Sequence, residues 1–403
     1  MLKEYRILKL FFLFLFFLPL SGCTTSGMGG AHELEDITPG EKPTIESYEG
    51  GVWYQIDKLE EAIKSKAALG GEMRLDDPKL EEYVRKVVCK VAGDHCKDIR
   101  TYIMNAPHFN AGMFPNGLML VNTGFLLRIQ SEAQLAAVLG HEIGHYVKRH
   151  GMKQQLDAKT KTDLANIIFT ITIGTVPMAG EDMRNLYNLI AMITYGSIQA
   201  FSRNHEREAD RFGLEGMAKA GYDLDAAAKN WEWLIKEVEM HGHSTSAGYY
   251  SSHPSSPERA KNLRQQAKNL KEAEFPIINE DIYYQHILPH RGKWLESLVS
   301  LKNFKSANFV IDLWYGKNKN LGELDYYKGE VYFARSKDDD LEKAIKHYKK
   351  SINQEPDFYL PYRRLGLIYY KKKDQKYKEY FRKYVMLKRD AKDRSMIESY
   401  INE

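Results

Sequence analysis

The stretch His141-Glu142-Ile143-Gly144-His145 constrains this chain more than any other part of its sequence. On an α-helix, His141 and His145 are one turn apart on the same face, so both imidazoles can reach a single metal ion. Zinc binds imidazole nitrogens at about 2.0–2.1 Å, and a zinc site that acts on a substrate keeps one position open for water. Glu142 lies one step around the helix, where its carboxylate can take a proton from that water. The pattern predicts one zinc ion per chain, with Glu142 as general base.

The residues before this motif predict the helix that it needs. Residues 131–140 read SEAQLAAVLG, which contains strong helix formers and an apolar stripe. Ser131 is suited to the N-cap position. Without a metal, the same pattern would describe an exposed amphipathic helix with solvated histidines. A third ligand elsewhere in the chain would decide between the two interpretations.

The candidate for the third ligand lies about 60 residues downstream. One class of zinc peptidases has a histidine six residues after the second ligand, but this chain has Gly151 there. His150 is five residues after His145, off the ligating face of a continuous helix, and we expect it to be solvated. Glu206 and Asp210 share a helix face at i and i+4. Taken alone, a stretch this charged is usually a solvated helix face. Paired with the histidine motif, it predicts that Glu206 binds zinc and that Asp210 accepts a hydrogen bond from the far nitrogen of a ligating histidine.

Together, the two motifs resemble those of a known peptidase family. The gluzincin peptidases that include the CAAX prenyl proteases and the bacterial heat-shock protease HtpX have HExxH followed by ExEADR, and residues 206–211 read EREADR. By this match Glu206 is the ligand and Glu208 is not. The resemblance covers about residues 45–265, and residues 105–122 look like the strands before the active-site helix. Among these peptidases, the chain most resembles the periplasmic BepA-type members with C-terminal tetratricopeptide repeats.

The resemblance also points to His253 and Arg259, which match the family's His-Pro-x-x-x-x-Arg element. Either side chain could stabilise the oxyanion that forms when water adds to a peptide carbonyl. His253 could instead occupy the open position on the metal and keep the resting enzyme inactive. Without a functional role, His253 would be a loop residue before a turn proline, and Arg259 would form an ordinary salt bridge.

Residues 1–22 have the composition of a signal peptide, with a basic start followed by a short apolar run. Residues 20–23 read LSGC and resemble the lipobox of bacterial lipoproteins, which implies cleavage before Cys23 and lipidation of its thiol. An uncleaved anchor helix is the alternative. Thr24, in place of aspartate, points to the outer membrane. Residues 23–45 are rich in Gly, Thr, Ser and Pro and predict a flexible tether.

The other two cysteines are Cys89 and Cys96. An exported protein enters an oxidising compartment, so we expect these two residues to form a local disulfide. Two unpaired buried thiols are the alternative. A zinc site built on them is disfavoured, because the histidine motif supplies better ligands.

The apolar pattern predicts an α+β fold that is mostly helical, with a small β-sheet beside the helix that carries HExxH. Two amphipathic helices precede strands at Ile99–Met104 and Leu118–Val121, with a hairpin turn at Asn116-Gly117. A strand beside the active-site helix could hold an extended peptide by backbone pairing. Further on, uncharged runs at residues 164–180 and 186–201 predict a helical hairpin, which packs on the catalytic domain or dips into the lipid surface.

From about Pro289 the chain reads as pairs of helices. Gly329 and Tyr332 recur 37 positions later as Gly366 and Tyr369, which is typical of a tetratricopeptide-like repeat. Such repeats stack into a solenoid with a concave binding surface. We therefore expect four segments, which are a signal peptide (1–22), a tether (23–45), a zinc metallopeptidase domain (46–275) and a helical repeat domain (276–403).

These features predict a zinc endopeptidase that is lipid-anchored to the periplasmic face of the bacterial outer membrane. The resemblance implies protein quality control, with unfolded or misassembled envelope proteins as substrates and the outer-membrane assembly machinery as the partner of the repeats. The net charge of +4 is spread over many acids and bases, so the composition does not require nucleic acid. The alternative is a periplasmic chaperone or adaptor for outer-membrane protein assembly, with a mostly latent zinc site. Glu142 favours the enzyme, because a structural zinc site does not need a base beside its histidines.

Overall fold

The computed structural model describes residues 34–65, 73–161, 201–240, 253, 257–270, 273–317 and 320–403. The predicted signal peptide, Cys23 and almost all of the two uncharged runs lie outside these residues, so what the sequence predicts for them remains a prediction. Among the described helices, none combines the length and the apolar character that crossing a membrane would require.

Two helices come first, as the sequence predicts. They are α1 (Tyr48–Lys64) and α2 (Pro78–Ala92). Helix α2 begins after Asp77 because the Asp77 side chain accepts hydrogen bonds from two backbone amides of the first turn, and Pro78 is pre-shaped for the first helical position. The 3₁₀ helix η1 (Gly93–Asp98) follows, and a disulfide joins Cys89 to Cys96 across this change of direction.

The sheet has three strands in the order β1-β3-β2. The predicted strands correspond to β1 (Arg100–Met104) and β3 (Leu118–Asn122), which are parallel. The additional short strand β2 (Ala111–Met113) pairs antiparallel with β3. The turn at Asn116-Gly117 connects β2 to β3, and Gly117 has a φ of 85°, a conformation that glycine adopts without strain.

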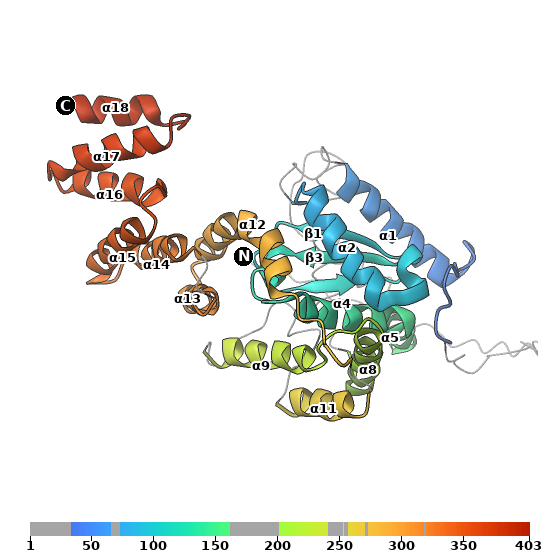
Figure 1. The fold of residues 1–403 in the computed structure, drawn as a ribbon. Helices are drawn as coiled ribbons and strands as arrows, with labels where there is room; N and C mark the ends of the chain where they lie inside the picture. The colour runs from blue at the N-terminus through green and yellow to red at the C-terminus, as the bar shows by residue number, and fades with distance from the viewer. Residues whose placement is uncertain are drawn as a thin grey trace, which may run out of the picture. The chain divides into compact units, whose positions relative to one another are not determined.

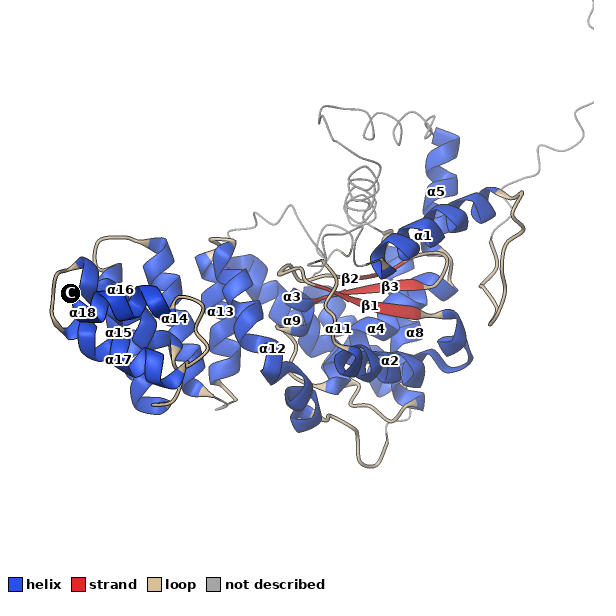
Figure 2. Ribbon diagram, turned by 90° about the horizontal axis from the view of Figure 1, so that it is seen from above, coloured by secondary structure: helices blue, strands red, loops and turns tan. Residues whose placement is uncertain are grey.

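Each face of the sheet is covered by helices, because successive side chains of a strand point to opposite faces. Tyr102 and Leu120, which are partners in the register, pack with apolar residues of α1. Their neighbours Ile103 and Val121 belong to the larger core, which includes α2 and α4. Figures 1 and 2 show the strands with α1 and α4 beside them. The sheet therefore has α1 on one face and α4 on the other.

Helix α4 (Glu132–Val147) carries the HExxH motif, and all of its residues are buried. Ser131 caps it by accepting a hydrogen bond from the amide of Gln134, as predicted. The short α3 (Thr123–Leu126) precedes α4, and four helices of the same domain follow it, namely α5 (His150–Lys161), α8 (Arg203–Lys219), α9 (Asp225–Met240) and α11 (Pro257–Lys268).

Helices α4 and α8 cross at glycines. A Cβ atom on Gly140 would lie 3.0 Å from the Cα of Gly213, and one on Gly144 would lie 2.8 Å from the Cα of Ala209. A methyl group does not fit at either place, so the two backbones touch directly. This close approach brings the first turn of α8, which contains Glu206, next to the histidines of α4.

The C-terminal region is entirely helical in its described residues. It contains α12 (Glu280–Ser300), α13 (Phe304–Tyr315), α14 (Leu321–Arg335), α15 (Asp340–Gln354), α16 (Leu360–Lys371), α17 (Lys376–Leu387) and α18 (Arg394–Asn402). Pro289, where the sequence places the start of the helix pairs, lies inside α12. The fold class is confirmed. Residues 35–403 form one compact unit, so the domain boundary at residue 275 remains a prediction.

The predicted repeat has a clear structural basis in two helix pairs. Gly329 of α14 contacts the ring of Tyr348 on α15, and a Cβ atom on Gly329 would lie 2.4 Å from that ring. Gly366 of α16 stands in the same relation to Phe381 of α17, at 2.3 Å. In both pairs a glycine on the first helix accommodates an aromatic ring from the second. The recurrence of glycine in the sequence therefore reflects a recurrence of packing.

Candidate metal centre

Four buried side chains from separate parts of the chain converge on one point. His141, His145, Glu206 and His253 each offer one ligand atom, and these atoms all lie within 4.8 Å of one another. The Nε2 atom of His141 is 3.0 Å from Nε2 of His145 and 3.1 Å from Nδ1 of His253. The same His253 nitrogen is 3.0 Å from Oε1 of Glu206. Three imidazole nitrogens and a carboxylate oxygen therefore surround a space of atomic size.

The protonation of these groups suits a zinc ion. An ionised carboxylate only accepts hydrogen bonds, so Nδ1 of His141, which is 2.9 Å from Oδ1 of Asp210, carries the proton and Nε2 offers a lone pair. Burial lowers the pKa of His145 well below its ordinary value, so this imidazole is neutral. Neutral imidazoles and a carboxylate are the ligands that zinc takes in proteins. The residues present therefore fit zinc.

Glu206 stays ionised although it is buried. Burial alone would raise the pKa of Glu206, but its electrostatic interactions with His253 and Arg259 and its contact with His145 outweigh that effect and lower it. Helix α8 fixes this carboxylate in its first turn, where the hydroxyl of Ser202 caps the helix. An ionised carboxylate in this place can act as a metal ligand.

Arg259 binds the carboxylates around the centre. Its Nε and Nη2 atoms donate to the two oxygens of Asp210 at 2.8 and 2.7 Å, and its Nη1 atom forms an ion pair with Glu206. Its guanidinium lies 3.7 Å from the ring centre of Trp231 on α9. Burial would raise the pKa of Asp210, but the charge of Arg259 and the hydrogen bond with His141 lower it. Asp210 and Arg259 therefore link His141 to Glu206 through hydrogen bonds and an ion pair. Neither residue belongs to the group of four potential ligands.

His253 lies between the metal-binding atoms and Glu142. Its Nδ1 faces Glu206, and its Nε2 is 3.5 Å from Oε1 of Glu142. Glu142 is buried and follows His141 directly on α4. The ring of Phe201 stacks on His145, with 3.9 Å between ring centres. The imidazole of His253 thus lies between Glu206 and Glu142 and approaches both carboxylates.

His150 is buried, and the expectation that it is solvated is wrong. None of its surface is exposed, its Nδ1 lies 2.9 Å from Nδ1 of His145, and its Nε2 lies 2.9 Å from Oε2 of Glu208. The expectation assumed one continuous helix. In the structure α4 ends at Val147, and Arg149 has a φ of 56°, so the chain turns back and places His150 against the second histidine of the motif.

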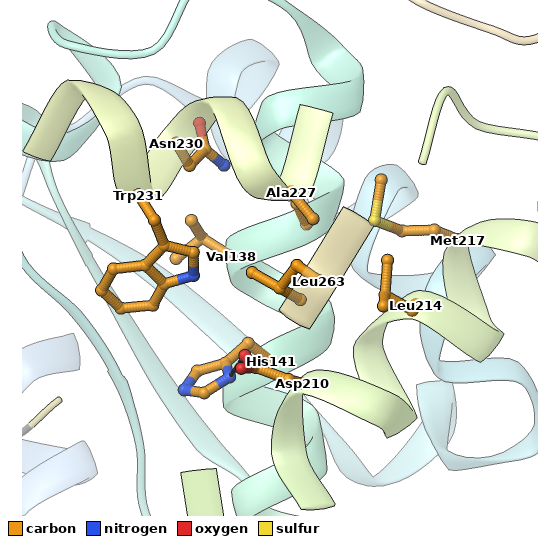
Figure 3. A pocket seen from close by; sticks show the side chains of 10 residues that line it. Val138, His141, Asp210, Leu214, Met217, Ala227, Asn230, Trp231 and Leu263 are labelled. Carbon is orange, nitrogen blue, oxygen red and sulfur yellow. Dashed lines mark hydrogen bonds and ion pairs between the residues drawn. The ribbon is translucent and has the colours of Figure 1, made fainter. Parts of the chain in front are cut away.

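A small cavity of about 20 Å³ lies behind the centre. Figure 3 shows His141 and Asp210 on one side of it and apolar side chains such as Leu214 and Leu263 around the rest. The space is enough for about one water molecule. The inner side of the centre therefore borders an apolar core, and a hydrogen bond between His141 and Asp210 is strong in such surroundings.

The structure brings most of the predicted site residues together. The group consists of His141, Glu142, His145, Glu206, Asp210, His253 and Arg259. The sequence reasoning missed Trp231 and the partnership of His150 with Glu208. Trp231 belongs to no motif, and only its position on an amphipathic helix would have placed it in the interior. Glu208, the glutamate of the EREADR segment to which the sequence analysis gives no role, was the signal that could have indicated a partner for His150.

Comparison with known proteins agrees with this geometry. Residues 74–267 match Peptidase family M48, and residues 329–373 match a TPR repeat. The chain is 32% identical over 168 residues to "Metalloendopeptidase OMA1, mitochondrial" of Bos taurus, which is 40% of this chain and 31% of that protein. It is 29% identical over 306 residues to "Putative beta-barrel assembly-enhancing protease" of Vibrio cholerae, which is 71% of this chain and 58% of that protein. It is 25% identical over 224 residues to "Beta-barrel assembly-enhancing protease" of Escherichia coli, which is 53% of this chain and 44% of that protein.

The matched regions span only 31% to 58% of the length of these three relatives. The M48 match nevertheless contains every residue of the metal centre, and the TPR match includes the contact between Gly329 and Tyr348 and extends to Gly366. The resemblance stated from the sequence is confirmed. The chain is therefore similar to peptidase family M48 over residues 74–267 and to a tetratricopeptide repeat over residues 329–373.

Proposed function

We propose that this chain is a zinc-dependent endopeptidase. The observation that carries the proposal is the convergence of His141, His145 and Glu206 on one point, with the buried carboxylate of Glu142 beside it. A helix that only stabilised the fold would not need two histidines, a base and a distant glutamate at one place. We assign His141, His145 and Glu206 as the ligands of one zinc ion per chain.

Zinc in this place would lower the pKa of a water molecule and polarise the carbonyl of the scissile peptide bond. Glu142 takes the proton from the attacking water and returns it to the leaving amine, as general base and then general acid. Asp210 holds the tautomer in which Nε2 of His141 is a ligand. Arg259 acts as a positioning residue, because its donors are directed at Asp210 and Glu206 and not at the space in front of Glu142.

We infer that His253 holds the resting enzyme inactive. Its Nδ1 belongs to the group of potential ligand atoms, and its ring lies between that group and Glu142. In this position it occupies the place of the catalytic water, so substrate has to displace it. A latch of this kind restrains a protease that works among unfolded proteins. The alternative role, donation to the oxyanion, would require His253 to move without losing contact with the centre.

The edge of the sheet offers a place for an extended substrate. In the strand order β1-β3-β2, β2 is an edge strand, and it packs beside α4, which carries the motif. A peptide in extended form can pair with such an edge through its backbone, which makes binding largely independent of sequence. This suits an endopeptidase that acts on unfolded chains of many sequences.

We further propose that the substrates are misfolded or stalled envelope proteins and that the repeat region binds the outer-membrane assembly machinery or its clients. The names of the Vibrio cholerae and Escherichia coli relatives support this proposal. In the same view, Cys23 is lipidated and anchors the protein to the periplasmic face of the outer membrane. A Cys23→Ser variant that still fractionates with the outer membrane after washing in high salt and carbonate would exclude this anchor.

The second candidate function is a chaperone or adaptor with a mostly latent zinc site, which the repeats and the position of His253 both favour. One experiment separates the two functions. The lipid-free protein is incubated with a reduced, unfolded test protein, with and without a zinc chelator. A protease cleaves the test protein, loses this activity with the chelator and regains it with added zinc. A chaperone prevents aggregation of the test protein under all three conditions and leaves it intact.

A further inference from the structure

The second histidine of the motif has a hydrogen-bonded support that reaches the protein surface. Nδ1 of His145 is 2.9 Å from Nδ1 of His150, and Nε2 of His150 is 2.9 Å from Oε2 of Glu208. His150 is fully buried, whereas the side chain of Glu208 is 46% exposed. The three residues therefore form a line from the metal centre to solvent, with each ring nitrogen of His150 in contact with one neighbour.

The order of protons along this line follows from its outer end. An ionised carboxylate only accepts, so Nε2 of His150 donates its proton to Glu208. In the neutral imidazole the other nitrogen, Nδ1, is then an acceptor, so the proton between the two histidines belongs to Nδ1 of His145. That leaves a lone pair on Nε2 of His145, the atom that lies 3.0 Å from Nε2 of His141 in the metal centre. Both hydrogen bonds of this line can form only with one tautomer of His145. In that tautomer Nε2 is free to bind a metal.

The local fold is built to hold this contact. Arg149, immediately before His150, adopts a left-handed conformation with a φ of 56°, which costs a non-glycine residue roughly 1 kcal/mol. Arg149 is held there by ion pairs with Glu41 and Glu49, which lie about a hundred residues earlier in the chain. On the other side, the ring of His205 stacks on His150 with 4.2 Å between ring centres. The turn and the stacking fix both the place and the plane of the His150 ring.

We propose that His150 and Glu208 are positioning residues that orient His145 for zinc, as Asp210 orients His141. Each of the two helical ligands thus has its own partner on α8. Asp210 acts directly on the first histidine. Glu208 acts on the second through the intervening imidazole of His150. In the EREADR segment, Glu206 is then the ligand, Glu208 orients His145 through His150, and Asp210 orients His141. This inference rests on the proposed zinc site.

The test measures the zinc dissociation constant of the full lipid-free chain by competition with a chromophoric chelator. His150→Phe keeps the stacking surface but cannot accept a hydrogen bond from His145, and it should weaken zinc binding by roughly 10–100-fold, as loss of such partners does. His150→Gln, whose amide can accept from one side and donate to the other, should recover part of the affinity. Glu208→Gln should weaken zinc binding by about tenfold, the lower end of the same range. The effect is smaller because Glu208 is one hydrogen bond further from the ligand His145 than His150 is.

Glu215→Gln is the matched control, because Glu215 is also on α8, has a side chain that is also 46% exposed, and forms an ion pair with Arg211 at the surface. It should bind zinc as the wild type does. In the metal-free wild type, long-range ¹H–¹⁵N correlation spectra should place the proton of His145 on Nδ1, and in His150→Phe on both nitrogens. Equal zinc affinity for Glu208→Gln and Glu215→Gln would overturn the inference. This comparison remains decisive if His150→Phe does not fold. A wild type that binds no zinc would instead overturn the proposed function.

Discussion

Asp210 joins two parts of the centre through one carboxylate. It accepts a hydrogen bond from His141 and two from Arg259, and Arg259 in turn holds Glu206. The carboxylate is buried in the protein interior, where such bonds are strong and where an unpaired group is costly. At the scale of single residues, the centre therefore depends on the groups behind the ligands as well as on the ligands.

Replacing Asp210 by Asn should weaken zinc binding by roughly 10–100-fold, because His141 loses the partner that fixes its tautomer. Replacing Glu206 by Gln should lower zinc occupancy more, because it removes a ligand. Zinc content after dialysis against a weak chelator measures both effects. Full zinc occupancy in the Glu206→Gln variant would show that another residue is the third ligand, with Glu208 as the next candidate.

Replacing His253 by Ala separates its two possible roles, because they predict opposite signs. Removal of a latch should raise the basal rate of peptide cleavage. Removal of an oxyanion donor should lower the rate by a hundredfold or more, since one such donor is worth about 2.7–4 kcal/mol. We expect the rise. Rates are compared at equal zinc content, and an unchanged rate would exclude both roles.

The residues of the centre were predictable to different degrees. His141, Glu142 and His145 follow from helix periodicity, and Glu206 and Asp210 follow from the same periodicity together with a family resemblance. The place of His150 could not be predicted, because it depends on a left-handed turn at Arg149, and no periodic pattern indicates such a turn at an arginine. Trp231 was not predictable either, because its contact with Arg259 is set by how α9 and α11 pack.

At the scale of elements, the crossing of α4 and α8 determines the distance between the histidines and Glu206. The two backbones touch because the crossing residues are small, with Gly144 against Ala209 and Gly140 against Gly213. Helix α4 can accept these glycines, although they disfavour a helix, because it is buried on all sides by the sheet and its neighbours. The elements themselves were largely predictable, since β1, β3, α2 and α4 have clear apolar patterns in the sequence. The distance at which the helices pack against one another was not predictable.

Gly144→Ala should therefore destabilise the protein and weaken the centre. The added methyl group would lie 2.8 Å from the Cα of Ala209 and 2.9 Å from its carbonyl oxygen, so α8 has to move. Overpacking of this kind costs about 1–3 kcal/mol. Denaturant unfolding measures the loss, with Gly51→Ala as control, because a methyl group on that glycine of α1 meets nothing within 4 Å. A Gly144→Ala variant as stable as Gly51→Ala would contradict this account of the crossing.

The contact between α1 and the sheet should depend on pH through Glu60. Burial would raise the pKa of Glu60, but hydrogen bonds from Arg100, Lys64 and Tyr102 outweigh it and lower the pKa to about 2. The unfolded chain has the ordinary value of 4.5, so the contribution of Glu60 to stability is complete above that pH and is lost as the pH falls toward 2.

Glu60→Gln should reduce the fall in unfolding free energy between pH 6 and pH 3. The neighbouring variant Glu61→Gln serves as control, because the side chain of Glu61 is 67% exposed and pairs only weakly with Lys58. Parallel stability curves for the wild type and Glu60→Gln would show that Glu60 does not hold α1 to the sheet in this way.

At the scale of the whole molecule, the sequence predicted a peptidase domain followed by helical repeats, and the family matches agree. The repeat was visible because a buried aromatic ring needs a glycine opposite it, so Gly329 and Gly366 recur with the packing. The extent of the repeat region was less clear, because a proline inside a helix, Pro289 in α12, reads as a boundary. Residues 35–403 form one compact unit, and the boundary at residue 275 remains a prediction.

Substitution of Glu142 by Gln tests the central claim most directly. The amide keeps the volume of the side chain but cannot take the proton from water. The variant and the wild type are compared for zinc content and for cleavage of a reduced, unfolded test protein, with the metal-free wild type as a third sample. We predict equal zinc content, with turnover reduced by roughly 10²–10⁴-fold in the variant and a comparable loss in the metal-free sample. Cleavage at the wild-type rate by a zinc-loaded Glu142→Gln variant, or cleavage that persists without metal, would contradict the account.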